Sequence, residues 1–390
     1  MSSVSSVSRA PADGRVPADV LAALPPSAAP LTLIAADGSP RDGGGVLSMP
    51  PPEVLVELHR RMVIGRRFDA QATALTKQGR LAVYPSSRGQ DACQVGAVLA
   101  LREQDWLFPT YRDSMALVTR DVPPEGVLSL LRGDWHSGYD PYSHRAAPQC
   151  TPLATNTLHA VGFAHAARIK GEDTAALVFL GDGASSEGDT HEALNFAGVW
   201  RAPVVFLVQN NGYAISVPLA KQTAAPGLAY KGVGYGVRSL IVDGNDAAAV
   251  YAAVRAALSD AAAGRGPTLI EAITYRIEAH TNADDATRYR ASDEVQEWLA
   301  KDPIDRLETF LRDENLLDDD RLAAVRAEAE EFAAQVRARL NADPVLDPAG
   351  LFEHVYASPT AALAEQQAFL LREIAEHTSD GPSHRHGGEE

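Results

Sequence analysis

Two short polar segments of this 390-residue chain consist of residue types that bind phosphate groups and divalent cations. The segment 181–183 (GDG) follows the apolar run 175–180, and the pair 210–211 (NN) follows the apolar run 204–208. Glycines let backbone amides approach a phosphate closely, and a helix that follows offers its N-terminus to negative charge. Carboxylate and amide oxygens are hard ligands of the kind that Mg²⁺ prefers. The two segments together predict a magnesium and phosphate site.

The placement of these segments is more informative than either segment alone. A lone GDG is typical of a turn, and a lone NN is typical of a loop. Here each follows a run that is expected to form a buried strand, and a helix predicted over 191–199 connects the two strands. Ligands bind just beyond the carboxyl ends of the strands in open parallel sheets. We therefore expect the two segments to lie side by side if their strands are neighbours.

A dinucleotide site is an alternative that any glycine-rich turn raises. The GxGxxG pattern needs a third glycine, but Ser186 stands at that position of GDGASSEG. The next strand ends in Gln209 and Asn210, where an acid that binds the ribose is expected. The residues thus disfavour an NAD-dependent dehydrogenase.

The elements that must hold these segments alternate along the chain. Continuous apolar runs are typical of strands buried on both faces, and stretches of helical periodicity lie between them. Such alternation predicts an α/β fold with a doubly wound parallel sheet. The predicted strands are 175–180, 204–208, 239–242 and 268–272, and the predicted helices are 53–77, 91–102, 156–170, 191–199, 247–262 and 320–340.

Composition changes along the chain predict its organisation. Residues 1–48 are rich in Ala, Pro, Ser and Gly and are expected to form a flexible N-terminal arm. Residues 49–340 hold the alternating elements and form the predicted α/β domain. We expect a helical C-terminal extension over 341–376 and a disordered tail over 377–390, because the tail lacks apolar periodicity.

Charge and cysteine usage exclude several classes of protein. The net charge of −16 disfavours a nucleic-acid partner, and no apolar run is long enough to cross a membrane. The two cysteines, Cys93 and Cys150, form no CxxC pair, so neither a disulfide framework nor a structural zinc site is expected. Reduced thiols and an Arg- and Ala-rich, Lys-poor composition favour a cytoplasmic protein of a bacterium.

The segment around the two turns resembles a known family. Residues 181–216, GDGASSEGDTHEALNFAGVWRAPVVFLVQNNGYAIS, are similar to the thiamine-diphosphate motif in the alpha subunit of the decarboxylating first component of 2-oxo acid dehydrogenase complexes. The similarity extends over roughly residues 50–340. GDG and NN are shared by all thiamine-diphosphate enzymes, whereas SEGDTHEALNFA and QNNGYAIS narrow the resemblance to this subunit. It implies the thiamine-diphosphate-binding fold, with thiamine diphosphate and Mg²⁺ as cofactors.

Three further segments carry the same resemblance and imply roles for single residues. FPTYRDS (108–114) is similar to the segment that contacts the cofactor diphosphate, and CTPLATNTLHAVGFAHA (150–166) to the stretch at the aminopyrimidine, where Leu153 would hold the cofactor bent. YRIEAHTNADDATRYR (275–290) resembles the active-site loop, which gives His280 a catalytic role. The implied cofactor-binding residues are Tyr111, Arg112, Thr151, Leu153, Gly181, Asp182, Gly183, Ala184, Gln209, Asn211 and Tyr213, of which Asp182, Asn211 and Tyr213 would hold the metal.

The resemblance also implies that this chain is half of an active site. Thiamine catalysis needs a glutamate that activates the pyrimidine ring, and in this family the beta subunit supplies it. Glu187 and Glu192 are the nearby candidates here, but both lie on the diphosphate side and are expected at a helix start and on the surface. We therefore expect an alpha2-beta2 heterotetramer that works with a lipoyl-bearing acyltransferase core.

The implied reaction is oxidative decarboxylation of a 2-oxo acid with acyl transfer to lipoamide. General resemblance to bacterial alpha subunits favours pyruvate as the substrate, and branched-chain 2-oxo acids such as 3-methyl-2-oxobutanoate are the alternative. A catalytically inactive assembly or regulatory subunit is the alternative of another class. A single-chain transketolase-like enzyme is disfavoured, because the chain has no second domain with an activating glutamate.

Overall fold

The structure of the chain, a computed structural model, describes residues 26–27, 29–135, 137–342 and 347–379. The contacts divide the chain into two compact units, residues 1–341 and 342–390, and each unit is described by itself. No helix among the described residues is both long and apolar enough to cross a membrane.

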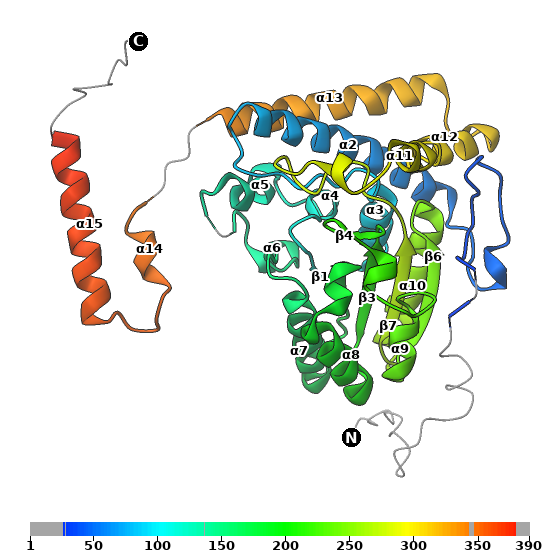
Figure 1. Cartoon of the computed structure of the whole chain (residues 1–390), viewed down its shortest axis with the longest axis horizontal. Helices are drawn as coiled ribbons and strands as arrows, with labels where there is room; N and C mark the ends of the chain where they lie inside the picture. The colour runs from blue at the N-terminus through cyan, green and yellow to red at the C-terminus, as the bar shows by residue number, and fades with distance from the viewer. Residues whose placement is uncertain (1–25, 28, 136, 343–346, 380–390) are drawn as a thin grey trace, which may run out of the picture. The chain divides into compact units, whose positions relative to one another are not determined.

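Five parallel strands form one sheet in the first unit (Figure 1). They are β1 (Trp106–Phe108), β2 (Ala176–Gly181), β3 (Val204–Asn210), β6 (Arg238–Asp243) and β7 (Thr268–Ile273). Their spatial order is β1-β2-β3-β7-β6, and every neighbouring pair is parallel. The prediction of a parallel α/β sheet is confirmed. β2 and β3 are neighbours, so the turns that follow them share one edge of the sheet.

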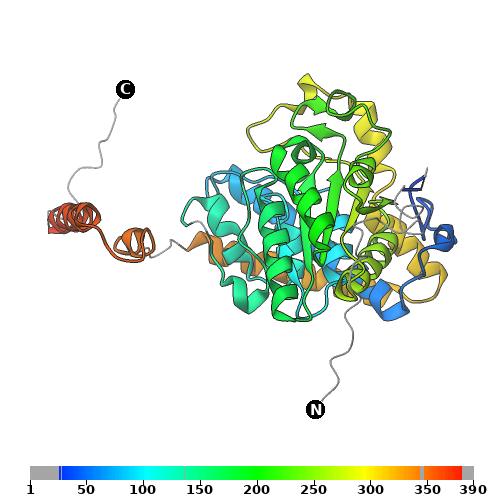
Figure 2. The ribbon, with the colours of Figure 1, turned by 90° about the horizontal axis from the view of Figure 1, so that it is seen from below.

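Helices cover both faces of this sheet (Figures 1 and 2). α7 (Thr155–Lys170) and α8 (Gly188–Trp200) pack together on one face, and α3 (Asp91–Leu99) packs with α10 (Ala247–Ala262) on the other. α2 (Pro52–Lys77) packs on α3, and α13 (Asp319–Asn341) runs along α2. The remaining helices of the first unit are α4 (Ser114–Thr119), α5 (Pro124–Arg132), α6 (Pro141–His144), α9 (Tyr230–Gly234), α11 (Ser292–Leu299) and α12 (Pro303–Asp313).

Short elements complete the first unit around the ends of the strands. The hairpin strands β4 (Tyr213–Ala214) and β5 (Val217–Pro218) follow β3 and pair antiparallel. The 3-10 helices are η1 (Gly43–Gly45), η2 (Gly183–Ser186), η3 (Leu219–Lys221) and η4 (Ala286–Arg288).

The side chains of β2 alternate between two apolar clusters. Leu177 and Phe179 pack in the cluster that contains α3 and α10, whereas Val178 and Leu180 pack in the cluster that contains α7 and α8. All four side chains are fully buried. Because β2 is covered by apolar clusters on both faces, a polar side chain within it would need a buried hydrogen-bond partner, and this explains why its sequence is continuously apolar.

The second unit contains two helices, α14 (Gly350–Glu353) and α15 (Ala361–Ser379). The predicted helical extension over 341–376 therefore contains helices, but the predicted disorder from residue 377 is wrong at its start. Residues 377–379 continue α15, because no glycine or proline interrupts the helix before Gly381. The rest of the predicted tail, 380–390, lies outside the described residues.

The prediction of a flexible arm over residues 1–48 is also wrong for residues 29–48, which the structure describes. Leu31, Leu33, Ile34 and Leu47 are buried in the main apolar cluster, and Leu31 pairs with Val242 beside β6. A composition rich in Ala, Pro and Gly concealed these four anchors, because an apolar side chain at an irregular spacing has no periodic signal. Residues 1–25 of the predicted arm lie outside the described residues.

One buried carboxylate holds this N-terminal segment. Asp246, at the start of α10, accepts hydrogen bonds from the backbone N–H groups of Leu33 and Ile34, each at 2.7 Å, and from Ala249 N–H at 3.1 Å. Arg306 donates through Nε to the carbonyl oxygen of Ile34 at 2.8 Å. The segment is thus tied to the body of the unit through its backbone.

We expect Asp246→Asn to lower the free energy of unfolding by roughly 2–4 kcal/mol, because an amide N–H would face buried N–H donors. Hydrogen exchange at residues 31–34 should accelerate in the same variant. Asp37→Asn is the control, since the Asp37 carboxylate is on the same segment but bonds only to nearby Ser39 at the surface. Wild-type exchange rates in Asp246→Asn would contradict this anchoring.

Candidate active site

A cavity of about 590 Å³ lies at the carboxyl ends of β2 and β3. The strand register pairs Gly181 with Gln209, so the turns that follow these residues lie side by side. Every site residue predicted from the sequence lines this cavity, although the residues come from five separate parts of the chain. They are Tyr111, Arg112, Thr151, Leu153, Gly181, Asp182, Gly183, Ala184, Gln209, Asn211, Tyr213 and His280. Their contacts with a cofactor stay predictions.

The turn after β2 exposes backbone to the cavity and holds a buried carboxylate. A Cβ atom added to Gly181 would meet no protein atom within 4 Å, whereas one added to Gly183 would lie 2.8 Å from Ala214 Cβ. Asp182 is buried and accepts a hydrogen bond from Gln222 Nε2 at 2.7 Å. Burial raises the pKa of the Asp182 carboxyl. The carboxylate has a neutral hydrogen-bond partner and would be stabilised by a bound cation.

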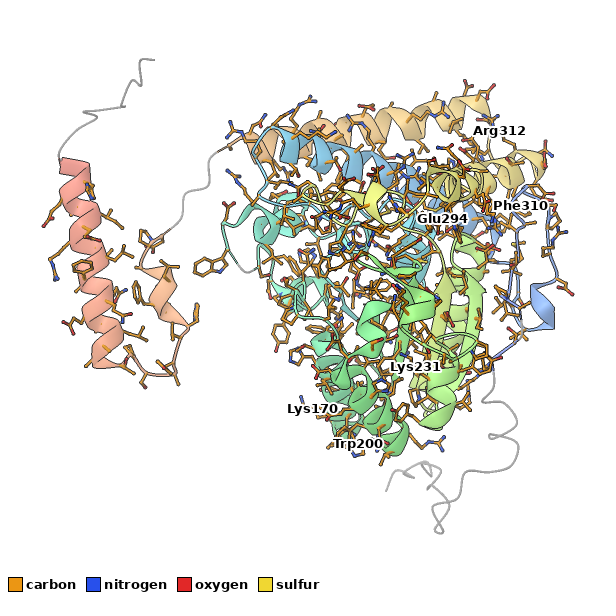
Figure 3. The ribbon with its side chains drawn as sticks, in the orientation of Figure 1. Lys170, Trp200, Lys231, Glu294, Phe310 and Arg312 are labelled. Carbon is orange, nitrogen blue, oxygen red and sulfur yellow. The ribbon has the colours of Figure 1, made fainter. Side chains whose placement is uncertain are left out.

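The turn after β3 presents amide and carbonyl oxygens. Asn211 Nδ2 donates to Gln90 Oε1 at 3.0 Å, and Asn211 Oδ1 accepts from Tyr213 N–H at 3.2 Å. The Tyr213 hydroxyl donates to Glu294 Oε2 at 2.9 Å. Glu294 is on α11 (Figure 3). Because its hydroxyl is engaged there, a metal contact from Tyr213 would use the backbone carbonyl. Asp182 and Asn211 thus supply the hard oxygen donors that suit Mg²⁺.

Gln209 is tied to the protein at both ends of its amide. Its Nε2 donates to Asp113 Oδ1 at 2.6 Å, and its Oε1 accepts from Gln90 Nε2 at 2.9 Å. These bonds orient the amide, so one N–H remains for the diphosphate contact that the resemblance implies.

Arg112 and His280 meet on the wall of the cavity. Arg112 is buried and donates through Nη1 to the carbonyl oxygen of Ser86 at 3.0 Å. Its Nη2 lies 3.0 Å from His280 Nδ1 and donates to the His280 carbonyl oxygen at 3.1 Å. A guanidinium cannot accept a hydrogen bond, so Nδ1 must be the acceptor and the ring proton must sit on Nε2.

The charge state of His280 follows from its surroundings. Burial, together with the guanidinium groups of Arg112 and Arg276, lowers the pKa of His280 to about 4. His280 is therefore neutral near pH 7 and can donate a hydrogen bond through Nε2. This favours hydrogen-bond donation to a reacting group over proton shuttling near neutral pH.

Arg276 is a cavity residue that the sequence analysis missed. It is fully buried, its Nη1 lies 3.4 Å from His280 Nδ1, and its Nη2 bonds to the Tyr289 hydroxyl at 2.8 Å. Its Nε has no hydrogen-bond partner among the described residues. Arg276 lies within the loop motif 275–290, and this was the only sequence signal for its role. Nothing in its type or spacing distinguished it from a surface arginine. Gln90 and Ile215 also line the cavity and were missed, as was Gln222, which donates to Asp182.

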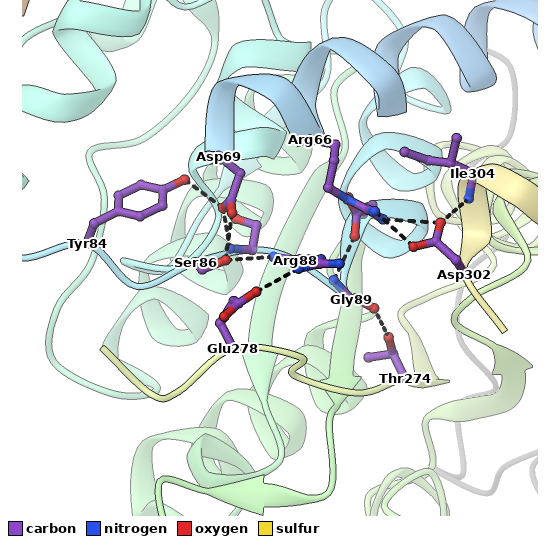
Figure 4. Close-up of polar contacts among 12 residues, drawn as sticks. Arg66, Asp69, Tyr84, Ser86, Arg88, Gly89, Thr274, Glu278, Asp302 and Ile304 are labelled. Carbon is purple, nitrogen blue, oxygen red and sulfur yellow. Dashed lines mark hydrogen bonds and ion pairs between the residues drawn. The ribbon is translucent and has the colours of Figure 1, made fainter. Parts of the chain in front are cut away.

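A short loop before α3 supports the cavity wall (Figure 4). Asp69 on α2 is buried and accepts hydrogen bonds from Tyr84 Oη at 2.8 Å, Ser86 Oγ at 2.6 Å and Ser87 N–H at 2.7 Å. These bonds hold Ser86, whose carbonyl oxygen receives Arg112. The loop thus connects the long helix α2 to the position of the Arg112 guanidinium.

The same loop ends in a close backbone approach. Gly89 has φ +94°, and a Cβ atom there would lie 2.1 Å from the Tyr275 carbonyl oxygen. Asp91 accepts from Gly89 N–H at 2.7 Å and from Arg66 Nε at 2.6 Å. A side chain at residue 89 would separate the loop from the segment that follows β7, so glycine is required at this position.

Leu153 and Glu187 complete the cavity with side chains of different character. Leu153 is 45% exposed although it is a large apolar residue, and it lines the cavity just before α7. Its role as the wedge that holds the cofactor bent stays a prediction. Asp182 and the exposed Glu187 are the carboxylates among the described cavity residues, and Glu192 on α8 is exposed outside the cavity.

Comparisons with known proteins agree on one family. Residues 59–348 match the family described as "Dehydrogenase E1 component". The chain is 45% identical over 346 residues to the "3-methyl-2-oxobutanoate dehydrogenase subunit alpha" of Mycobacterium tuberculosis, covering 89% of this chain and 94% of the relative. It is 40% identical over 317 residues to the "Pyruvate dehydrogenase E1 component subunit alpha" of Staphylococcus aureus, covering 80% and 85%. The chain belongs to the dehydrogenase E1 component family.

The lowered pKa of His280 predicts a pH-dependent difference in stability. Between its ordinary pKa of 6.5 and about 4, the unfolded chain binds a proton that the folded chain does not, so the folded state loses stability as pH falls. His280→Gln should lessen the drop in melting temperature between pH 6.5 and pH 5. His354→Gln is the control, because His354 is exposed in the second unit. Parallel pH curves for wild type and His280→Gln would refute the assignment.

Proposed function

We propose that this chain is the alpha subunit of a thiamine-diphosphate-dependent 2-oxo acid dehydrogenase. The observation that carries the proposal is the single cavity in which Asp182, Asn211, Arg112 and His280 meet. The two relatives, both named as alpha subunits of 2-oxo acid dehydrogenases, support it. An NAD-binding enzyme lacks comparable support, because no acid follows β3 at the position of a ribose contact.

The residues at the two turns fit a magnesium–diphosphate group. Asp182 Oδ, Asn211 Oδ1 and the Tyr213 carbonyl would hold the metal, and the open space at Gly181 would admit the diphosphate. Arg112 would contact the diphosphate with a fixed fork of donors, and Tyr111 lies beside it. Thiamine diphosphate, when bound, supplies the electron sink for decarboxylation.

His280 contributes a neutral donor in this proposal. Arg112 holds the imidazole through Nδ1, and the proton on Nε2 can be donated to the substrate's oxygen atoms within the cavity. Leu153 and Ile215 line the cavity with apolar surface, which would exclude water from the reacting atoms.

Catalysis by this chain would need a partner. Among the described residues, the carboxylates that line the cavity are Asp182, in the turn after β2, and Glu187, at the start of α8. Both lie on the proposed diphosphate side, so neither replaces the activating glutamate that the family resemblance assigns to a beta subunit. We propose an alpha2-beta2 assembly that transfers its acyl group to a lipoyl-bearing acyltransferase core. The bacterial origin of the relatives supports action in the bacterial cytoplasm.

The identity of the 2-oxo acid substrate is the most specific part of the proposal. The sequence analysis favoured pyruvate, and the relative named for pyruvate supports that choice at 40% identity. The relative named for 3-methyl-2-oxobutanoate is more similar, at 45% identity over a larger share of the chain. We therefore propose a branched-chain 2-oxo acid as the first substrate to test and pyruvate as the second. The two acids differ by a few methyl and methylene groups. A hydrophobic pocket discriminates such a difference by about 1–3 kcal/mol of transition-state binding free energy.

The direct test is kinetics of the chain purified together with its beta subunit. We expect decarboxylation that requires both chains, thiamine diphosphate and Mg²⁺, with kcat/KM about tenfold or more higher for the preferred acid. The preference is read from a comparison of 3-methyl-2-oxobutanoate with pyruvate. Full activity of this chain alone would overturn the half-site proposal, and inactivity of the pair toward every 2-oxo acid would favour the regulatory alternative.

Gly181→Ala tests the diphosphate contact without disturbing the fold. The new methyl group would meet no protein atom within 4 Å, so the melting temperature should stay at the wild-type value. The methyl group would occupy space assigned to the diphosphate, and the dissociation constant for thiamine diphosphate should rise about tenfold or more. Gly162→Ala on α7 is the matched control, because its Cβ atom also meets nothing within 4 Å but lies outside the cavity. Equal cofactor affinity in both variants would argue against diphosphate binding at Gly181.

A further inference from the structure

A fully buried glutamate lies behind the cavity and does not line it. Glu271 is on β7, where it pairs in register with Val208 of β3 and Ile241 of β6. A buried carboxylate costs several kcal/mol of desolvation unless hydrogen bonds compensate it. Its two oxygens therefore have to be matched by donors, and those donors belong to the two sides of the cavity.

One oxygen of Glu271 holds the turn after β3. Asn210 Nδ2 donates to Glu271 Oε1 at 2.7 Å. Asn210 Oδ1 in turn accepts from Gly212 N–H at 3.2 Å, which closes the turn around Asn211. Because Glu271 can only accept, it determines which end of the Asn210 amide faces the turn.

The other oxygen holds the segment that supports the turn after β2. Ala229 N–H, at the start of α9, donates to Glu271 Oε2 at 2.8 Å. Lys231 is on α9 (Figure 3). Its Nζ donates to the carbonyl oxygen and the hydroxyl of Ser185, at 2.6 Å and 3.0 Å. The Ser185 hydroxyl then donates to the Asp182 carbonyl oxygen at 2.6 Å.

The path through Glu271 therefore joins the two turns that carry the proposed metal ligands. Gly227 lies against the same carboxylate, since a Cβ atom there would be 2.9 Å from Glu271 Oε2. The segment before α9 is thus held close to β7, and no side chain separates it from the carboxylate. Hydrogen-bonded partners behind metal ligands tune metal affinity by about 10–100-fold in other proteins.

We propose that Glu271 is a positioning residue that sets the separation between Asp182 and Asn211 and thereby the affinity for Mg²⁺. The inference rests on the proposed function, because it assigns the metal to these two turns. Glu271 touches neither the metal ligands nor the cavity, and it acts through Asn210 on one side and through α9 on the other.

Glu271→Gln tests the proposal with a readout other than activity. The amide would place an N–H group against either Asn210 Nδ2 or Ala229 N–H, so one of the two contacts must be lost. We expect the Mg²⁺ concentration for half-maximal thiamine-diphosphate binding by the alpha-beta pair to rise about tenfold. Binding is followed by isothermal titration at a fixed cofactor concentration. Asp246→Asn is the matched control: it also changes a buried carboxylate that accepts backbone N–H groups, but away from the cavity.

A double-mutant cycle distinguishes positioning from general destabilisation. If Glu271 acts through Asn210, the losses of Mg²⁺ affinity in Glu271→Gln and Asn210→Ala should not add, and Lys231→Met should lower Mg²⁺ affinity by itself. Wild-type Mg²⁺ affinity in Glu271→Gln, a loss equal to that in Asp246→Asn, or full additivity in the cycle would each overturn the proposal. If the wild-type pair binds no cofactor in the presence of Mg²⁺, the proposed function fails and the inference fails with it.

Discussion

The parallel pairing of β2 with β3 is the constraint on which the site depends. Gly181 is opposite Gln209 in the ladder, so the chain leaves the sheet twice at the same edge and in the same direction. A shift of register would separate the carboxylate of Asp182 from the amide of Asn211. The register is held by apolar side chains on both faces of each strand, because every residue of β3 is buried. The same strand register therefore determines both the packing of the core and the position of the proposed cation site.

Electrostatics explains why the metal and the diphosphate would bind together. Arg112 and Arg276 provide positive charge in the cavity, and burial together with these two guanidinium groups keeps His280 neutral near pH 7. Asp182 provides a buried carboxylate in the same cavity, and burial raises its pKa. A diphosphate next to this carboxylate would be repelled unless a divalent cation lay between them. The proposed site would thus bind the metal and the diphosphate together better than either component alone.

The sequence predicted this arrangement best where one physical rule dominated. Strands β2 and β3 place side chains in the apolar clusters on both faces of the sheet, so their continuous apolar runs identified them. β1 has only three residues, too few for any periodic signal, and it was missed. The N-terminal segment was misjudged because Leu31 and its neighbours bury at irregular spacing. Arg276 was missed because its burial depends on contacts with Ile215, His280 and Tyr289, which only the folded loop brings together. Cavity residues were found by motif and resemblance, whereas the supporting hydrogen bonds of Asp69 and Glu271 needed the structure.

The central claim, that the turns after β2 and β3 hold one metal ion together with the cofactor, can be tested by metal-directed cleavage. Fe²⁺ replaces Mg²⁺ in the alpha-beta pair with thiamine diphosphate, peroxide is added, and the cut positions are read by mass spectrometry. The account predicts cofactor-dependent cuts in both turns, within residues 181–184 and 210–213, which excess Mg²⁺ suppresses. Cofactor-dependent cuts in only one turn, or at a different part of the chain, would contradict it.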